Sequence, residues 1–265
     1  MNANPLGRWL LGGAAALGVI FLALPLVVIV SASFTATEYL AFPPRGLTLR
    51  WYAQFLQDSS YLQSIGLSAQ LAVAATATAL VLGIPVALVL ARSKNRVNTA
   101  IAALFLSPLA LPTIVIGAAL LQFATKFGFA RTWFALYVGH CVLVIPYVVR
   151  TGLASLAGFQ LSLEEAAQDL GAARVQTFFL VTLPIMKPGV IAGALFGLII
   201  SWVNVELSIF HSTAALMPLP VKLFNYVQYS IDPMIAAVSA GTIYVAVAVV
   251  LVIDWVFGID RINAG

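Results

Sequence analysis

Charged side chains are scarce in this sequence. Only 8% of its 265 residues are Asp, Glu, Lys or Arg, whereas 62% are hydrophobic. An ordinary soluble domain carries roughly 25% charged residues and needs them to cover its surface, so most of this chain must be surrounded by lipid. The apolar residues also come in long blocks between short polar stretches, which excludes a soluble core with a single membrane anchor.

Cysteine and the usual catalytic motifs are also nearly absent. The one cysteine, Cys141, lies in an apolar block, which excludes an intramolecular disulfide and argues against a cysteine-based metal site. The chain lacks a His-Glu-x-x-His zinc motif, a Gly-x-Ser-x-Gly elbow and a pair of aspartates within a span, so we expect no enzyme, no catalytic residue and no metal site. The net charge of +4 comes without a basic groove or an aromatic RNA motif, so no nucleic-acid partner is expected.

Six apolar blocks are long enough to cross about 30 Å of hydrocarbon, which takes roughly 20 residues. They cover residues 9–31, 64–91, 99–124, 132–149, 189–210 and 234–257. We therefore predict an all-α integral membrane protein with a single domain of six spans over residues 1–265. The first block, after Arg8, has some features of a cleaved signal peptide, but it is longer than a typical signal core, which favours a retained helix. Prolines within spans two to four predict kinks or frayed turns: Pro85, Pro108, Pro112 and Pro146.

The basic residues indicate how the spans are oriented. Arg92, Lys94 and Arg96 crowd the tight turn after the second span, and positive residues favour the cytoplasmic side. Both termini and the long polar loop at residues 150–188 then lie in the cytoplasm. The loop at residues 34–63 lies outside, and its mixture of aromatic and polar residues predicts a short helix along the outer interface.

The cytoplasmic loop carries a distinctive pattern. Ser162, followed three residues later by Glu165, predicts a capping box and the start of a helix. Gly171 offers the left-handed residue that ends a helix, and a second helix is expected to run from about Ala172 to Pro184, with Pro188 opening the next span. One face of the first helix is apolar and collects Leu163, Ala166, Ala167 and Leu170.

Glu165-Ala166-Ala167, followed by Gly171 and then by Val181-x-Leu183-Pro184, resembles the "EAA" loop of binding-protein-dependent ABC importer permeases. Val181 stands where the family usually has isoleucine. Further likenesses at residues 47–52 and 107–112, and at His140 and Pro146, make the chain most similar to the shorter permease of spermidine/putrescine-type importers.

This resemblance implies a type I ABC importer permease in the bacterial inner membrane, whose cytoplasmic loop docks a coupling helix on an ATPase. The residues that the resemblance assigns to coupling are Glu164, Glu165, Ala166, Ala167, Asp169, Gly171, Leu183 and Pro184. Glu165 has an alternative role as no more than the capping partner of Ser162.

The resemblance also implies the partners. They are two ABC ATPase subunits, a second permease that is a different chain, a periplasmic solute-binding protein and membrane lipid. The chain lacks the Gly-x4-Gly-Lys-Ser/Thr loop that cradles phosphates, so we expect no cofactor here and ATP with Mg²⁺ on the ATPase. The solute is then small and polar, cationic or zwitterionic: a polyamine, an aminophosphonate or an amino-acid-like molecule, carried from periplasm to cytoplasm.

Polar groups within spans are costly and tend to face a water-filled path, which selects candidates for solute contact. Glu206 is the foremost, and helical spacing predicts that Trp202 shares its face while Asn204 points the opposite way. Asn204 stands where polyamine-type relatives are rich in aspartate. His140 and Pro112 complete the candidate path, although a structural hydrogen bond is the favoured role for His140, and Glu206 has pairing with a neighbouring helix as its alternative.

Small residues recur every four positions in the fifth span, at Gly189, Gly193, Gly197 and Ser201, and predict a face for close helix packing. The alternative to the importer is a secondary transporter or channel that needs no ATPase. It would explain the spans and Glu206, but it leaves the spacing from Glu165 to Pro184 without a reason.

Overall fold

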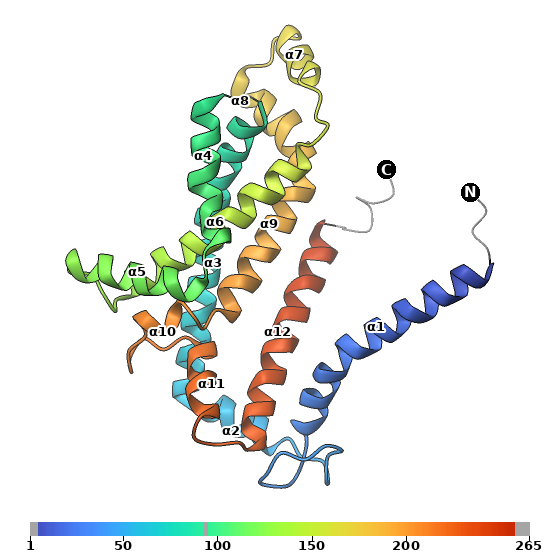
Figure 1. The fold of residues 1–265 in the computed structure, drawn as a ribbon, viewed down its shortest axis with the longest axis vertical. Coiled ribbons are helices and arrows are strands. Elements are labelled where there is room, and N and C mark those ends of the chain that lie inside the picture. The colour runs from blue at the N-terminus through green and yellow to red at the C-terminus, as the bar shows by residue number, and fades with distance from the viewer. Residues whose placement is uncertain (1–4, 93–94, 258–265) are drawn as a thin grey trace. The chain divides into compact units, whose positions relative to one another are not determined.

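The computed structural model describes residues 5–92 and 95–257, and within these ranges the ordered backbone is helical (Figure 1). A single antiparallel bridge, between Thr35 and Leu47, is the β pairing found there. The α-helices are α1 (Pro5–Ala32), α2 (Arg50–Gln57), α3 (Ser59–Arg92), α4 (Arg96–Leu106), α5 (Thr113–Lys126), α6 (Trp133–Ser155), α7 (Ser162–Asp169), α8 (Arg174–Thr177), α9 (Leu183–Val203), α10 (Ser208–His211), α11 (Leu219–Val227) and α12 (Pro233–Phe257). A 3₁₀ turn, η1 (Ser107–Ala110), follows α4, and a π-helical turn, η2 (Phe178–Thr182), joins α8 to α9.

Five helical segments in the described ranges are long and apolar enough to cross a membrane, and the bent pair α4 and α5 makes six if it counts as one span. The third span was expected as one kinked helix over residues 99–124. Instead, its two halves meet at 111°. Pro112 has no N–H to continue a helix and forces the preceding residue, Leu111, into an extended conformation with φ −103° and ψ 141°, so the chain breaks there.

The fifth span differs from its predicted bounds of 189–210 at both ends. A continuous 30-residue helix runs from Arg174 through η2 to Val203. Pro184 was expected to end a helix, and Pro188 to open the next, but both lie inside α9. Pro184 is the second residue after the π-helical turn, where the change of hydrogen-bond register accommodates its missing N–H.

The chain forms two compact units. In the described residues, unit 1 holds 5–62 and 225–248, and unit 2 holds 63–92, 95–224 and 249–257. In unit 1, α1 exposes its apolar side chains, as a lipid-facing helix does. The helix expected in the loop at residues 34–63 is present as α2, where Trp51 and Phe55 are buried and the Trp51 Nε1–H donates to the Thr35 carbonyl at 2.9 Å.

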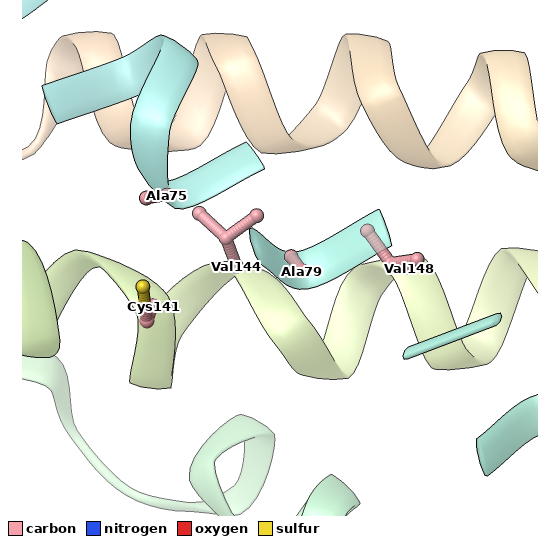
Figure 2. Packing of buried hydrophobic residues seen from close by; sticks show 5 residues of the cluster. All are labelled: Ala75, Ala79, Cys141, Val144 and Val148. Carbon is pink, nitrogen blue, oxygen red and sulfur yellow. The ribbon is translucent and has the colours of Figure 1, made fainter. Parts of the chain in front are cut away.

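The core of unit 2 lies where α6 meets α3 and α9. Ala75 and Ala79 of α3 lie opposite Cys141, Val144 and Val148 of α6, small side chains against small or branched ones (Figure 2). Lipid offers no hydrophobic reason for helices to associate, so close van der Waals packing through small residues must hold these helices together.

The packing face predicted on α9 is confirmed. Cβ atoms added at its three glycines would lie within 3 Å of atoms on α3 or α6. At Gly189 a Cβ would lie 2.5 Å from the Thr151 carbonyl oxygen, at Gly193 2.7 Å from Thr151 Oγ1, and at Gly197 2.7 Å from Val144 Cγ1. The spacing of four residues therefore marks the seam along which α9 touches α6.

We predict that Gly189→Ala lowers the stability of the purified protein by about 1–3 kcal/mol, because the added methyl group meets backbone that cannot move aside. Thermal unfolding in detergent would show this as a lower Tm. Gly66→Ala is the matched control, since a Cβ at Gly66 of α3 meets nothing within 4 Å and alanine is the better helix former. Equal Tm values for the two variants would contradict the tight seam.

Candidate functional site

Helix α7 begins at Ser162, as predicted, but not through a capping box. Its N-cap residue is Leu161, and no side chain caps the helix. Leu161 itself has helical dihedral angles, and its carbonyl accepts from the N–H groups of Glu164 and Glu165 at 3.0 and 3.1 Å. Because the chain enters the helix already coiled, Ser162 falls inside the first turn. Glu165 therefore has no capping duty, and its side chain is exposed.

The end of α7 is as the sequence predicts. Gly171 has φ +92°, in the left-handed region that favours glycine. The Ala172 N–H donates to the Ala167 carbonyl at 3.0 Å, and the Gly171 N–H donates to the Gln168 carbonyl at 2.9 Å. These two bonds form a Schellman motif, which satisfies the last carbonyls of α7 and turns the chain sharply toward α8.

The two neighbouring glutamates of α7 point to different surroundings. Glu164 is buried, although the sequence assigned it to coupling together with Glu165. The Arg92 Nη2 group donates to both of its carboxylate oxygens, at 2.7 and 2.8 Å, and the Thr182 hydroxyl donates to Oε1. Sequence reasoning missed Arg92 and Thr182, because no local pattern links residues so far apart in the chain.

The outward face of α7 is apolar and small. Leu163, Ala166 and Leu170 are exposed, and Leu170 is 90% exposed, while Ala167 is half-buried. Asp169 is exposed on the last turn. Beside the inward face lies a pocket of about 290 Å³, whose lining includes Arg92, Glu164, Gln168, Arg174 and Thr182. Of the other residues assigned to coupling, Leu183 is half-buried and Pro184 is exposed at the start of α9.

The opposite end of α9 is a break in the helix. Asn204 leaves the helix with φ −72° and ψ 118°, and its side-chain oxygen accepts from the N–H groups of Leu207 and Ser208 at 3.1 and 3.3 Å. Asn204 thus satisfies the orphan donors of the next turn, which becomes α10. We call residues 204–207 the α9–α10 break.

This break corrects the prediction that Trp202 and Glu206 share a helix face. The helix ends at Val203, so no helical spacing relates the two side chains. Trp202 is half-buried in the last turn of α9, and Glu206 is exposed on the turn before α10. The helix stops because the Asn204 side chain offers the backbone an alternative to the next helical bonds.

His140 connects α6 to both sides of the break. It is buried, with Nδ1 2.6 Å from the Ser201 hydroxyl of α9 and Nε2 3.1 Å from the Ser208 hydroxyl of α10. The Ser208 hydroxyl also lies 3.4 Å from the Asn204 side-chain oxygen, to which it donates. The structure therefore brings His140 and Asn204 into one polar cluster, the His140 cluster, with Ser201 and Ser208.

The second broken span approaches the same region. Pro112 is exposed at the break before α5, and α5 packs on α10 through Gly117. A Cβ on Gly117 would lie 2.8 Å from the Phe210 ring and 3.0 Å from the Leu207 Cα. Pro112, Asn204 and Glu206 thus belong to two interrupted helices that touch. Among residues 5–92 and 95–257, no three His, Cys, Asp or Glu side chains gather as metal ligands.

The described residues form an all-helical fold with five apolar spans, or six if the bent pair α4 and α5 counts as one, and a short helix–turn–helix between spans, which is the architecture of a multi-span membrane protein. The chain belongs to the family described as "Binding-protein-dependent transport system inner membrane component", whose model matches residues 79–261. The expected fold class and the expected function, a permease subunit of an ABC importer rather than a channel or secondary transporter, are thereby confirmed.

Several relatives cover most of the chain. It is 31% identical to the putrescine transport system permease protein PotI of Escherichia coli (strain K12), over 90% of this chain and 87% of that protein. It is 27% identical to the spermidine/putrescine transport system permease protein PotC of the same strain, over 94% and 93%. The molybdenum transport system permease protein ModB of Haemophilus influenzae is 37% identical over 51% of this chain and 65% of ModB.

A solved structure shares the fold. The crystal structure of a bacterial ABC transporter involved in the import of the acidic polysaccharide alginate contains a chain that superposes with a TM-score of 0.72, at 18% identity, covering 97% of this chain and 99% of that one. A chain in the crystal structure of a bacterial alginate ABC transporter in complex with alginate pentasaccharide-bound periplasmic protein gives a TM-score of 0.62 at 16% identity, over 93% of each chain.

We predict that His140→Ala destabilises the protein by about 1–3 kcal/mol, because at least the buried Ser201 hydroxyl loses its partner. Denaturant or thermal unfolding in detergent measures the loss. Thr125→Ala is the control: Thr125 is exposed and its hydroxyl bonds only within its own helix, to the Leu121 carbonyl, so its change should stay within about 0.5 kcal/mol. A His140 variant as stable as the Thr125 variant would show that the His140 cluster does not contribute to the stability of the protein.

Proposed function

We propose that this permease moves a small cationic or zwitterionic solute of the polyamine kind into the cytoplasm. It would act with a second, different permease, two ABC ATPase subunits that bind ATP and Mg²⁺, and a periplasmic solute-binding protein. Aminophosphonates and amino-acid-like molecules share the same charge pattern and are the other solutes to test. The observation that carries the choice of solute is the exposed carboxylate of Glu206 at the α9–α10 break.

The orientation that we propose places α7, both termini and the turn between α3 and α4 in the cytoplasm. Arg92 at the end of α3 contacts Glu164 of α7, so α7 and this end of α3 lie on the same side of the membrane. Arg92 ends α3 and Arg96 begins α4, and short loops rich in Arg and Lys favour the cytoplasm. An ATPase bound at α7 then faces the ATP of the cell.

We propose that the outward face of α7 docks on the ATPase. Leu163, Ala166 and Leu170 form an exposed apolar strip that nothing in the described parts of this chain covers. The small Ala166 side chain permits close approach of a partner's backbone, and the exposed Glu165 adds a charge beside the strip. Leu183 and Pro184 are the first residues of α9, so we expect a push on α7 to be passed on to this helix.

We predict that Gly171→Val weakens this coupling. A β-branched residue in the left-handed region costs about 1–2 kcal/mol, so the Schellman turn opens and α7 loses its orientation. Solute-stimulated ATP hydrolysis by the reconstituted importer should fall roughly 5- to 30-fold, as that free energy implies. Gly171→Asn is the matched control, because asparagine tolerates positive φ and should retain most of the stimulation. Full stimulation in the valine variant would contradict a docking role for α7.

Irregular backbone is costly in a membrane. Non-helical backbone is tolerated there where protein buries it or where it lines a water-filled cavity. Transporters place solute sites at such discontinuous helices. The α9–α10 break is held by Asn204 and by His140, and its one ionisable side chain, Glu206, remains exposed. A carboxylate there attracts cations and repels anions, which agrees with the putrescine and spermidine/putrescine relatives PotI and PotC.

We predict that Glu206→Gln lowers transport of putrescine about fivefold or more, since one charge contact in water at 4 Å is worth about 1 kcal/mol. Uptake into proteoliposomes that hold the complete importer measures the rate, while ATP hydrolysis without solute should not change. Glu38→Gln is the control, because Glu38 is likewise exposed but lies in the loop after α1.

Three results would count against this role of Glu206. Equal uptake by the Glu206 and Glu38 variants would remove Glu206 from the solute path. A loss of assembly or Tm for every solute alike would make it a structural residue. An unchanged preference for putrescine over a zwitterionic amino acid or an aminophosphonate would show that the carboxylate does not select the charge of the solute.

A further inference from the structure

We infer that Glu164 is a positioning residue that fastens α7 to two spans at once, and that it makes no contact with the ATPase. This inference rests on the proposed docking of α7. Glu164 bonds to Arg92, the last residue of α3, and to Thr182, the last residue of the π-helical turn before α9. Arg92, Glu164 and Thr182 are called the α7 clamp below.

Burial separates Glu164 from its neighbour. The Glu164 side chain is 9% exposed, and both of its carboxylate oxygens are already bonded within this chain. Glu165, one residue later, points outward and is exposed. A partner bound to the outward face of α7 can reach Glu165, whereas it would have to break the α7 clamp to reach Glu164.

The clamp is the main attachment of α7. Of the eight residues of α7, all of which the structure describes, Glu164 alone is buried. The apolar residues Leu163, Ala166 and Leu170 point away from the rest of the chain and contribute little to holding the helix. The helix is therefore held by a charged, directional contact instead of apolar packing, and such a contact fixes the rotation of α7 about its own axis.

The π-helical turn has a reason in this arrangement. Each residue of an α-helix advances about 100° around the axis, and a π turn adds one residue, so it rotates every side chain that follows. Thr182 is the last residue of η2, and it is fully buried with its hydroxyl on Glu164 Oε1. Without the added residue, Thr182 would point to another side of the helix, and α7 would lose its bond to α9.

The clamp also lies where it can transmit movement. Arg92 ends the 34-residue α3, and Thr182 lies within the continuous helix Arg174–Val203. The pocket of about 290 Å³ beside the clamp admits water to Arg92, whose side chain is 46% exposed. A displacement of α7 by the ATPase is thus delivered to both spans, and loss of the clamp should let α7 move without them.

The test compares Glu164→Gln with Glu165→Gln in the complete importer, reconstituted in proteoliposomes with putrescine as the probe. Glu164→Gln should keep the ATPase subunits bound and ATP hydrolysis within about twofold of the wild type. Putrescine transported per ATP hydrolysed should fall about fivefold or more, since α7 slips relative to α3 and α9. Glu165→Gln should instead lower the recovery of ATPase subunits with the permease, with transport per ATP unchanged in the complexes that form.

Charge reversal gives a second readout that general destabilisation would not produce. Arg92→Glu and Glu164→Arg should each lower transport per ATP, and the double variant should recover at least half of the wild-type ratio. Thr182→Val keeps the shape of Thr182 and removes only its hydroxyl, so it should lower the ratio about twofold. This variant decides the matter if the charge variants fail to assemble.

The positioning role of Glu164 is overturned if the Glu164→Gln and Thr182→Val variants both transport as many putrescine molecules per ATP as the wild type. It is also overturned if the assembled charge-reversed double variant recovers nothing, or if Glu164→Gln loses ATPase subunits as Glu165→Gln does, which would assign Glu164 to docking. Failure of the proposed docking looks different. In that case Glu165→Gln and Gly171→Val would leave both ATPase recovery and stimulation unchanged.

Discussion

The close approach of α9 to α6 supports both candidate sites in unit 2. Gly189, Gly193 and Gly197 leave no room for a Cβ, so the two backbones run against each other. Ser201 continues the same face and meets His140, which carries the contact on to Ser208 of α10. Since lipid does not drive helices together, this fit of small residues must supply the attraction, and it does so in one register only.

Helix α9 joins the two ends of unit 2 as a rigid element. With its leading turns it runs for 30 residues, from Arg174 to Val203, which is about 45 Å at 1.5 Å per residue. Thr182 near one end holds Glu164 of α7, and Asn204 at the other end caps the turn that carries Glu206. Close-packed interiors transmit displacement instead of absorbing it, so a shift at α7 should reach the α9–α10 break along this helix.

The sequence predicts the features that depend on local spacing. Apolar blocks predict the spans, the four-residue spacing of Gly189, Gly193 and Gly197 predicts the seam, and Gly171 predicts the left-handed turn. The features that the sequence does not predict depend on residues far apart in the chain or on competing local interactions. Asn204 ends the fifth span because its side chain replaces helical bonds, which hydropathy does not register. Ser162 loses its capping role to a preceding residue that is already helical. Arg92 and Glu164 lie 72 residues apart, so their pairing follows from the fold alone.

The contacts in unit 2 are of two kinds. Some should persist during transport and others should exchange, and their chemistry differs accordingly. The seam between α6 and α9 is made of van der Waals contacts that weaken steeply with separation, so it favours one geometry and moves as a body. The attachments at its two ends are polar. Arg92 is about half exposed beside the pocket of about 290 Å³, so water can take the place of a lost partner there. The His140 cluster at the other end is buried. A hydrogen bond replaced by water costs far less than one broken in a dry core. Conformational change in unit 2 should therefore concentrate at α7, while the seam and the buried His140 cluster stay intact.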